Sequence, residues 1–210
     1  MYYFSTSRRP PEEEQRLLDA ALPWLREIII FALNTGMRQN EILSLKWSQV
    51  DLFRRTATLI ETKNKEKRTI PINQTVLEIL KSKDRVRSIS GYVFTSQTGS
   101  KLDARNLLRA FYAARKKVGL EDVRFHDLRH TFATRLVQAG VNLYVVKELL
   151  GHKSLTMTMR YAHHYPESLR HGVEVLDNDG HKMGTETTET GSVEHPACLP
   201  INLLQVVVNA

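Results

Sequence analysis

Hydrophobic positions in the first part of the chain follow a helical period. Pro10 and Pro11 precede an acidic first turn, and Gly36 follows the last apolar residues, which are the usual signals for the start and end of a helix. Pro23 predicts a break that divides this region into two helices. The second helix contains the run from Ile28 to Leu33, which is apolar on all sides, so we expect it to be buried.

The period of the pattern then changes. After a short helix predicted over Arg38–Leu45, the runs Thr56–Glu61 and Lys67–Ile72 are short and rich in β-branched residues. A polar turn separates them, and Pro71 stands at the end of the second run. This arrangement predicts an antiparallel hairpin.

The remaining apolar pattern up to residue 176 is again mostly helical. Residues 91–96 (GYVFTS) are predicted to form a short strand or loop. We expect helices over 73–83 and 102–118, with Gly119 as a C-cap, and several short helices between 122 and 176, with breaks at Gly140, Gly151–Ser154 and Pro166. The predicted fold class is therefore mainly α, with a small antiparallel β-hairpin sheet.

Composition adds exclusions to this picture. The single cysteine, Cys198, excludes a disulfide framework within the chain. No apolar run approaches the roughly 18 residues that a membrane span needs. The N-terminal residues lack the apolar stretch of a secretory signal.

Charge is distributed unevenly. The chain carries a net charge of +7, but residues 177–210 are net acidic (−4), so residues 1–176 carry +11. Nucleic acid is the leading partner for such a surface, with a generic basic protein as the alternative. The acidic segment is Thr-rich and is predicted to be disordered. Its apolar end, residues 199–208, either docks on this domain or on a neighbouring protomer, or has no role.

Two basic positions in the first half are suited to phosphate. Arg38 follows a glycine at the start of a helix, where its planar guanidinium can hold two phosphate oxygens. The alternative is a surface arginine or an ion pair with Glu41. The hairpin turn carries Lys63, with further cations at Lys65, Lys67 and Arg68. It is either a solvated charge run or a lysine carried into a DNA groove.

The second half contributes five further residues to consider. His126, Arg129 and His130 fall at i, i+3 and i+4, on one helix face. Zinc binding by the two histidines is disfavoured by the arginine between them, and the core-like neighbours of His130 favour a packing role for it. His152 follows a helix-ending glycine, and Tyr161 comes nine residues later. Either could simply be a cap or a core residue.

Taken together, these residues resemble the tyrosine recombinase, or phage integrase, family. The matching boxes are TGMRQNEILSLKW around Arg38, HDLRH from His126, LLGH ending at His152, and RYAH around Tyr161. They occur in the family's order, and the resemblance covers about residues 12–175. The family's catalytic domain is mainly helical with a small hairpin sheet, which agrees with the pattern above.

The resemblance implies transesterification at a DNA phosphodiester without metal or cofactor. Tyr161 is then the nucleophile that forms a 3′-phosphotyrosine link, and Tyr165 is its nearest rival. Arg38 and Arg129 would hold the non-bridging oxygens, and His152 would add a hydrogen bond. His126 is the implied base for the phenol, and Lys63, with Lys65 as the competing choice, is the implied acid for the leaving 5′-oxygen.

The resemblance also predicts organisation and partners. We expect a lead or linker over 1–11, a catalytic domain over 12–176, and a tail over 177–210 that is disordered or docks in trans. Family members usually carry an additional N-terminal DNA-clamping domain, so this sequence is either a fragment or a short form. Double-stranded DNA, a homotetramer on DNA, and a cytoplasmic, nucleoid-associated setting in a prokaryote, phage or mobile element are implied, with no membrane and no small-molecule substrate. A type IB topoisomerase and a truncated DNA-binding or regulatory relative are the alternatives.

Overall fold

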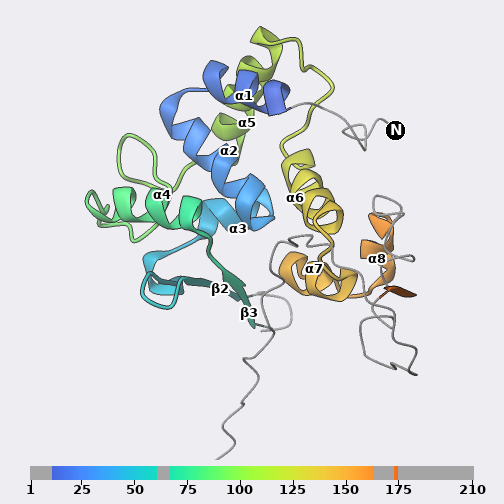
Figure 1. Ribbon diagram of the computed structural model, residues 1–210. Coiled ribbons are helices and arrows are strands. Elements are labelled where there is room, and N and C mark those ends of the chain that lie inside the picture. The colour runs from blue at the N-terminus through green and yellow to red at the C-terminus, as the bar shows by residue number, and fades with distance from the viewer. Residues whose placement is uncertain (1–10, 61–66, 163–172, 175–210) are drawn as a thin grey trace, which may run out of the picture. The chain divides into compact units, whose positions relative to one another are not determined.

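The computed structural model of the chain describes residues 11–60, 67–162 and 173–174 (Figure 1). The chain divides into two compact units, residues 1–170 and 171–210, and the elements below all belong to the first unit. The described helices are α1 (Pro11–Ala20), α2 (Pro23–Thr35), α3 (Gln39–Ser44), α4 (Gln74–Asp84), α5 (Ala104–Lys117), α6 (Asp127–Gln138), α7 (Leu143–Leu150) and α8 (Thr156–Met159), with a 3₁₀ turn at Trp47–Gln49. The strands are β1 (Val50–Asp51), β2 (Thr56–Ile60) and β3 (Lys67–Pro71).

Helix boundaries fall where the punctuating residues predict them. Pro23 occupies the first turn of α2, and Gly36 ends it in the left-handed region at φ 61°, where its N–H donates to Ala32 O at 3.0 Å. Gly151 ends α7 in the same way at φ 63°. None of the helices in the described ranges is long and apolar enough to cross a membrane.

The sheet contains the predicted hairpin and one further strand. Strands β2 and β3 pair antiparallel with Thr58 opposite Thr69, and β1 pairs antiparallel with β2 through Val50 and Ala57. The sequence predicted β2 and β3 but not β1, because a two-residue strand is too short to show an alternating pattern. The mainly helical fold with a small antiparallel sheet is confirmed.

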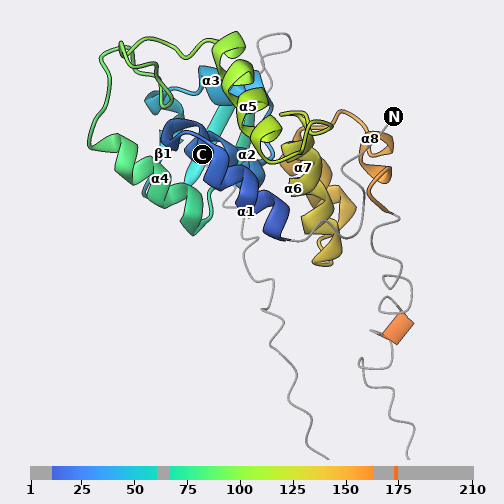
Figure 2. The ribbon, with the colours of Figure 1, turned by 90° about the horizontal axis from the view of Figure 1, so that it is seen from above.

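Helix α2 forms the centre of the main hydrophobic core. It packs against α4 and α6, which lie on opposite sides of it (Figure 2). Within the run from Ile28 to Leu33 every residue is 0–5% exposed except Ile30, which is partly buried, so the predicted burial of this run is confirmed apart from that position. The ring of Phe31 meets Phe94 edge to face, with centroids 5.0 Å apart.

A smaller hydrophobic cluster joins the last helices to the end of α2. Its buried members are Phe132, Ala133, Val137, Val146, Leu150 and Tyr161. A Cβ atom on Gly36 would lie 2.4 Å from Cδ1 of Phe132 and 3.2 Å from Cδ2 of Leu150. Only a glycine therefore allows the end of α2 to approach α6 and α7 this closely, and this approach brings the start of α3 next to the end of α7.

Candidate active site

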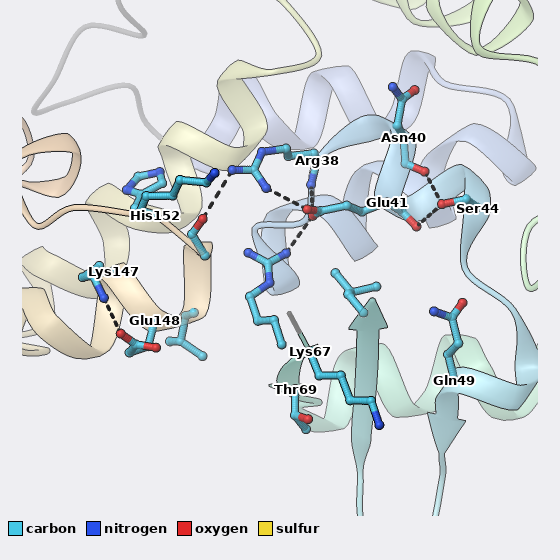
Figure 3. A pocket seen from close by; sticks show the side chains of 15 residues that line it. Arg38, Asn40, Glu41, Ser44, Gln49, Lys67, Thr69, Lys147, Glu148 and His152 are labelled. Carbon is cyan, nitrogen blue, oxygen red and sulfur yellow. Dashed lines mark hydrogen bonds and ion pairs between the residues drawn. The ribbon is translucent and has the colours of Figure 1, made fainter. Parts of the chain in front are cut away.

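Arg38 is fixed at the start of α3 by its own capping interactions. Its backbone is extended (φ −70°, ψ 151°), and its N–H donates to Oε2 of Glu41 at 2.7 Å. Its Nη1 donates to Oε1 of the same carboxylate at 2.8 Å (Figure 3). The ion pair considered as an alternative reading of Arg38 is therefore present. It leaves 39% of the Arg38 side chain exposed, so pairing and phosphate contact are compatible.

A second arginine reaches the same carboxylate from the sheet. Arg68 on β3 donates from Nη2 to Oε2 of Glu41 at 2.7 Å, although the two residues are 27 positions apart in the chain. A Cβ atom on Gly151 would lie 2.4 Å from Nη1 of Arg68, so this guanidinium lies directly against the end of α7. Arg38, Glu41, Arg68, Gly151 and His152 all line one open pocket of about 570 Å³ (Figure 3).

Arg129 connects the C-terminal ends of α2 and α7 through its guanidinium. It lies in the first turn of α6 and is 3% exposed. Its Nη1 donates to Gly36 O at 2.6 Å and its Nη2 to Leu150 O at 2.5 Å. Burial, and then the charge of Arg38, lowers the pKa of Arg129 to about 10, so the group stays protonated near neutral pH.

His152 follows the glycine that ends α7 and is held in a neutral form. Its Nδ1 lies 2.8 Å from Oγ1 of Thr158, which is fully buried. Burial, followed by the charges of Arg129 and Arg38, lowers the pKa of His152 to about 4. When the Thr158 hydroxyl donates to Nδ1, the neutral ring carries its hydrogen on Nε2 and can donate it to an anion.

Tyr161 lies just after α8, and its hydroxyl meets a histidine of α6. Its Oη is 2.6 Å from Nδ1 of His130, and the residue is 4% exposed. Burial, and then the nearby His126, lowers the pKa of His130 to about 4. The neutral ring can accept the phenol's hydrogen bond at Nδ1. His130, for which the sequence favoured a packing role, thus contacts the proposed nucleophile.

His126 precedes α6 at its N-cap position and is exposed. Its ring meets that of His130 edge to face, with centroids 4.9 Å apart. Although the residue as a whole is exposed, partial burial of the ring, and then the charge of Arg129, lowers the pKa of His126, so this ring is also neutral near pH 7. Across residues 11–60, 67–162 and 173–174, no group of three or more His, Cys, Asp or Glu side chains is placed to hold a metal ion.

Three candidates of the sequence analysis lie outside the described residues, namely Lys63, Lys65 and Tyr165. Lys67, the third lysine of the same region, is exposed on β3 and lines the pocket.

The structure brings the other candidates together in two connected groups. Arg38, Arg129 and His152 gather at the C-terminal end of α7, while Tyr161 lies with His130 beside α6. Sequence reasoning did not single out Arg68 or Thr158 as site residues. Arg68 was only one of several cations in a charged run. What distinguishes Arg68 is that it shares the carboxylate of Glu41 with Arg38, and this contact is visible only in the folded structure.

Comparison with known proteins places this geometry in a family. The model of the phage integrase family matches residues 8–168. The chain belongs to the phage integrase family. Among curated relatives, the integrase of Salmonella phage P22 is 36% identical over 181 residues, which covers 80% of this chain and 46% of that protein. The chain spans about half the length of the first curated relatives that it matches.

Solved phage integrase structures share the fold. The catalytic domain of the bacteriophage HP1 integrase is 32% identical, with a TM-score of 0.63, and the match covers 81% of this chain and 95% of that domain. A post-cleavage complex of the XerH site-specific recombinase with its palindromic difH substrate is 26% identical, with a TM-score of 0.62, over 82% of this chain and 54% of that one. The predicted catalytic-domain fold is thereby confirmed.

Proposed function

We propose that this chain carries the catalytic part of a site-specific DNA recombinase, which cuts and rejoins double-stranded DNA through a 3′-phosphotyrosine intermediate. The observation that carries the proposal is the convergence of Arg38, Arg129 and His152 on the end of α7. These two cations and one neutral donor are suited to the non-bridging oxygens of a phosphodiester, where negative charge builds up in the transition state. Relatives of the chain are named integrases and recombinases, which favours recombination over topoisomerase activity.

The proposed reaction conserves bond energy. Oη of Tyr161 attacks the phosphorus, the bond from phosphorus to the 5′-oxygen breaks, and a free 5′-hydroxyl is released. His126 takes the phenol's proton, and Lys63 gives a proton to the leaving oxygen. Attack by a second 5′-hydroxyl on the phosphotyrosine reverses these steps and rejoins the DNA.

The resting contact of Tyr161 has a consequence for this pathway. The Tyr161 hydroxyl is hydrogen-bonded to His130, and Tyr161 itself is only 4% exposed. For attack, the bond to His130 has to break and Oη of Tyr161 has to move to the phosphorus. Binding of DNA, and assembly of a homotetramer on it, are the events we propose to favour that movement. The proposed setting is the nucleoid of a prokaryotic cell, with the gene belonging to the prokaryote, to a phage or to a mobile element.

A capture experiment with random DNA tests the proposal and does not depend on the identity of the target site. The protein is incubated with a pool of nicked duplexes of random sequence, arranged so that the short fragment released on cleavage diffuses away. Covalent adducts are isolated under denaturing conditions, and their DNA is sequenced. We expect adducts joined to the protein through a 3′-phosphate, together with a released fragment that ends in a 5′-hydroxyl, from the natural chain and from Tyr165→Phe, and none from Tyr161→Phe. Failure of the natural chain to form an adduct would refute the proposal.

A further inference from the structure

Glu41 binds two arginines that come from different parts of the chain. Its Oε1 accepts from Nη1 of Arg38 at 2.8 Å, and its Oε2 accepts from Nη2 of Arg68 at 2.7 Å. Oε2 also accepts the backbone N–H of Arg38. The carboxylate is mostly buried, with 21% of the side chain exposed, so these bonds are shielded from water.

The division of the two oxygens determines how Arg38 is held. A carboxylate and a guanidinium in isolation favour two parallel hydrogen bonds, which occupy one whole edge of the arginine. Here Arg68 occupies Oε2, and the Arg38 guanidinium contacts the carboxylate only through Nη1. The other terminal nitrogen of Arg38, Nη2, has a long contact of 3.4 Å with Gly151 O.

We propose that Arg68 is a positioning residue for the phosphate pocket: by taking Oε2 of Glu41, it prevents that carboxylate from capturing Arg38 along a whole edge. Arg38 then keeps N–H groups available for a DNA phosphate. This inference rests on the proposed function, because it assigns Arg38 to the scissile phosphate.

Charge supports the same assignment. Arg38 and Arg68 are both paired with Glu41, and the three groups act on the nearby Arg129, whose pKa the two arginines lower and Glu41 raises. Removal of Arg68 therefore changes more than packing, because it leaves Arg38 as the guanidinium that is ion-paired with Glu41. The position of Arg68 against the backbone of Gly151 keeps its guanidinium at the carboxylate rather than in solvent, and its side chain is only 17% exposed.

A double-mutant cycle separates positioning from simple structural support. Adduct formation is measured at saturating DNA, together with DNA affinity, on a duplex recovered in the capture experiment. The variants are Arg68→Met, Glu41→Gln, their combination, and Arg68→Lys. Arg54→Met is the matched control, since Arg54 is on the same sheet region but its side chain is 81% exposed. Thermal melting confirms that each variant is folded.

We expect Arg68→Met to slow adduct formation about 10- to 100-fold with little change in DNA affinity, because it displaces the Arg38 donor without removing it, and complete removal of one transition-state donor costs about 10²–10³. Adding Glu41→Gln should restore at least about tenfold of that loss, because an amide binds Arg38 more weakly. Arg68→Lys should stay close to the natural rate. A double variant that is as slow as Arg68→Met, or slower, would overturn the inference.

A second measurement needs no DNA and remains decisive if no adduct forms. Nuclear magnetic resonance of the ¹⁵N-labelled chain reports rotation of the Arg38 guanidinium. We expect this rotation to slow in Arg68→Met, where Glu41 accepts hydrogen bonds from two nitrogens of the Arg38 guanidinium. Rotation should return to its natural rate in the double variant Arg68→Met, Glu41→Gln. Unchanged rotation in Arg68→Met would reject the role of Arg68, whereas a missing adduct in the natural chain would reject the proposed function.

Discussion

The hydroxyl of Tyr161 lies 2.6 Å from Nδ1 of His130, and the preceding residue of α6, Arg129, holds the ends of α2 and α7. Consecutive residues of one helix thus serve the two groups of the site. His130 holds the proposed nucleophile, and Arg129 supports the proposed phosphate pocket. We propose that movement of Tyr161 toward the phosphate requires loss of its bond to His130.

His130→Phe should therefore accelerate adduct formation about two- to tenfold. The change removes a hydrogen bond of about 0.5–1.5 kcal/mol that holds Tyr161 at rest, and it keeps an aromatic ring in place. Rates are measured on a nicked duplex under single-turnover conditions. His126→Gln is the comparison, and it should slow the reaction about 10²–10⁴-fold as loss of the base. A comparable slowing in His130→Phe would instead identify His130 as the base.

Thermal stability should fall as the pH is lowered from about 6.5 toward 4. Folding depresses the pKa of His130 and of His152 from 6.5 to about 4. Below pH 6.5 the unfolded chain binds protons that the folded chain excludes, so acid favours unfolding, while above pH 6.5 the two histidines contribute no pH dependence. His152→Asn and His130→Asn should each show a smaller decline in melting temperature between about pH 7 and 5. An undiminished decline in both would contradict the assigned pKa values.

Lys63→Ala should be rescued by sulfur at the leaving position. A bridging 5′-thiolate needs little protonation to depart, since a thiol has a pKa of about 8.5. The variant should cleave the sulfur-containing duplex nearly as fast as the natural chain does, a relative gain of about 10²–10⁴. Arg38→Ala should gain much less, because its proposed role is at the non-bridging oxygens. Rescue of Lys65→Ala or Lys67→Ala in its place would move the general acid to that lysine.

Gly151→Ala should damage activity more than stability. Residue 151 has φ 63°, and an added Cβ would lie 2.4 Å from Nη1 of Arg68, so Arg68 must shift away from Glu41. Gly119→Ala is the matched control, with φ 71° and no atom within 4 Å of its Cβ. Both should lose about 1–2 kcal/mol of folding stability from the left-handed backbone. Only Gly151→Ala should also slow adduct formation, by about tenfold or more. Equal rates in the two variants would argue against the role of this contact.

Much of the fold could be predicted from local signals in the sequence. Pro23, Gly36 and Gly151 mark helix boundaries because their backbone constraints act within a few residues. Strand β1 could not be predicted, since two residues carry no alternation and its pairing with β2 depends on the turn between them. The four sequence boxes likewise identified the family, because each box is a continuous run.

The site was predicted less completely than the fold. Arg38 and Glu41 are three residues apart, so their pair could be expected from helical spacing. The contacts of Glu41 with Arg68, and of Tyr161 with His130, join residues 27 and 31 positions apart. The periodicity of the sequence does not predict contacts between residues so far apart in the chain. The assignments of catalytic roles to His126, Lys63 and the other site residues stay predictions.

Mutations of Arg38 and of Arg129 should affect different properties of the protein, namely its activity and its abundance. Arg38 is partly exposed and held by one carboxylate, whereas Arg129 is buried and bonded to the carbonyls that end two helices. Changes at position 38 should give protein that accumulates normally but lacks activity. Changes at position 129 leave carbonyl groups without their donor in the interior, so they should lower the amount of folded protein as well. A genetic screen would then recover separation-of-function alleles at the first arginine and abundance defects at the second.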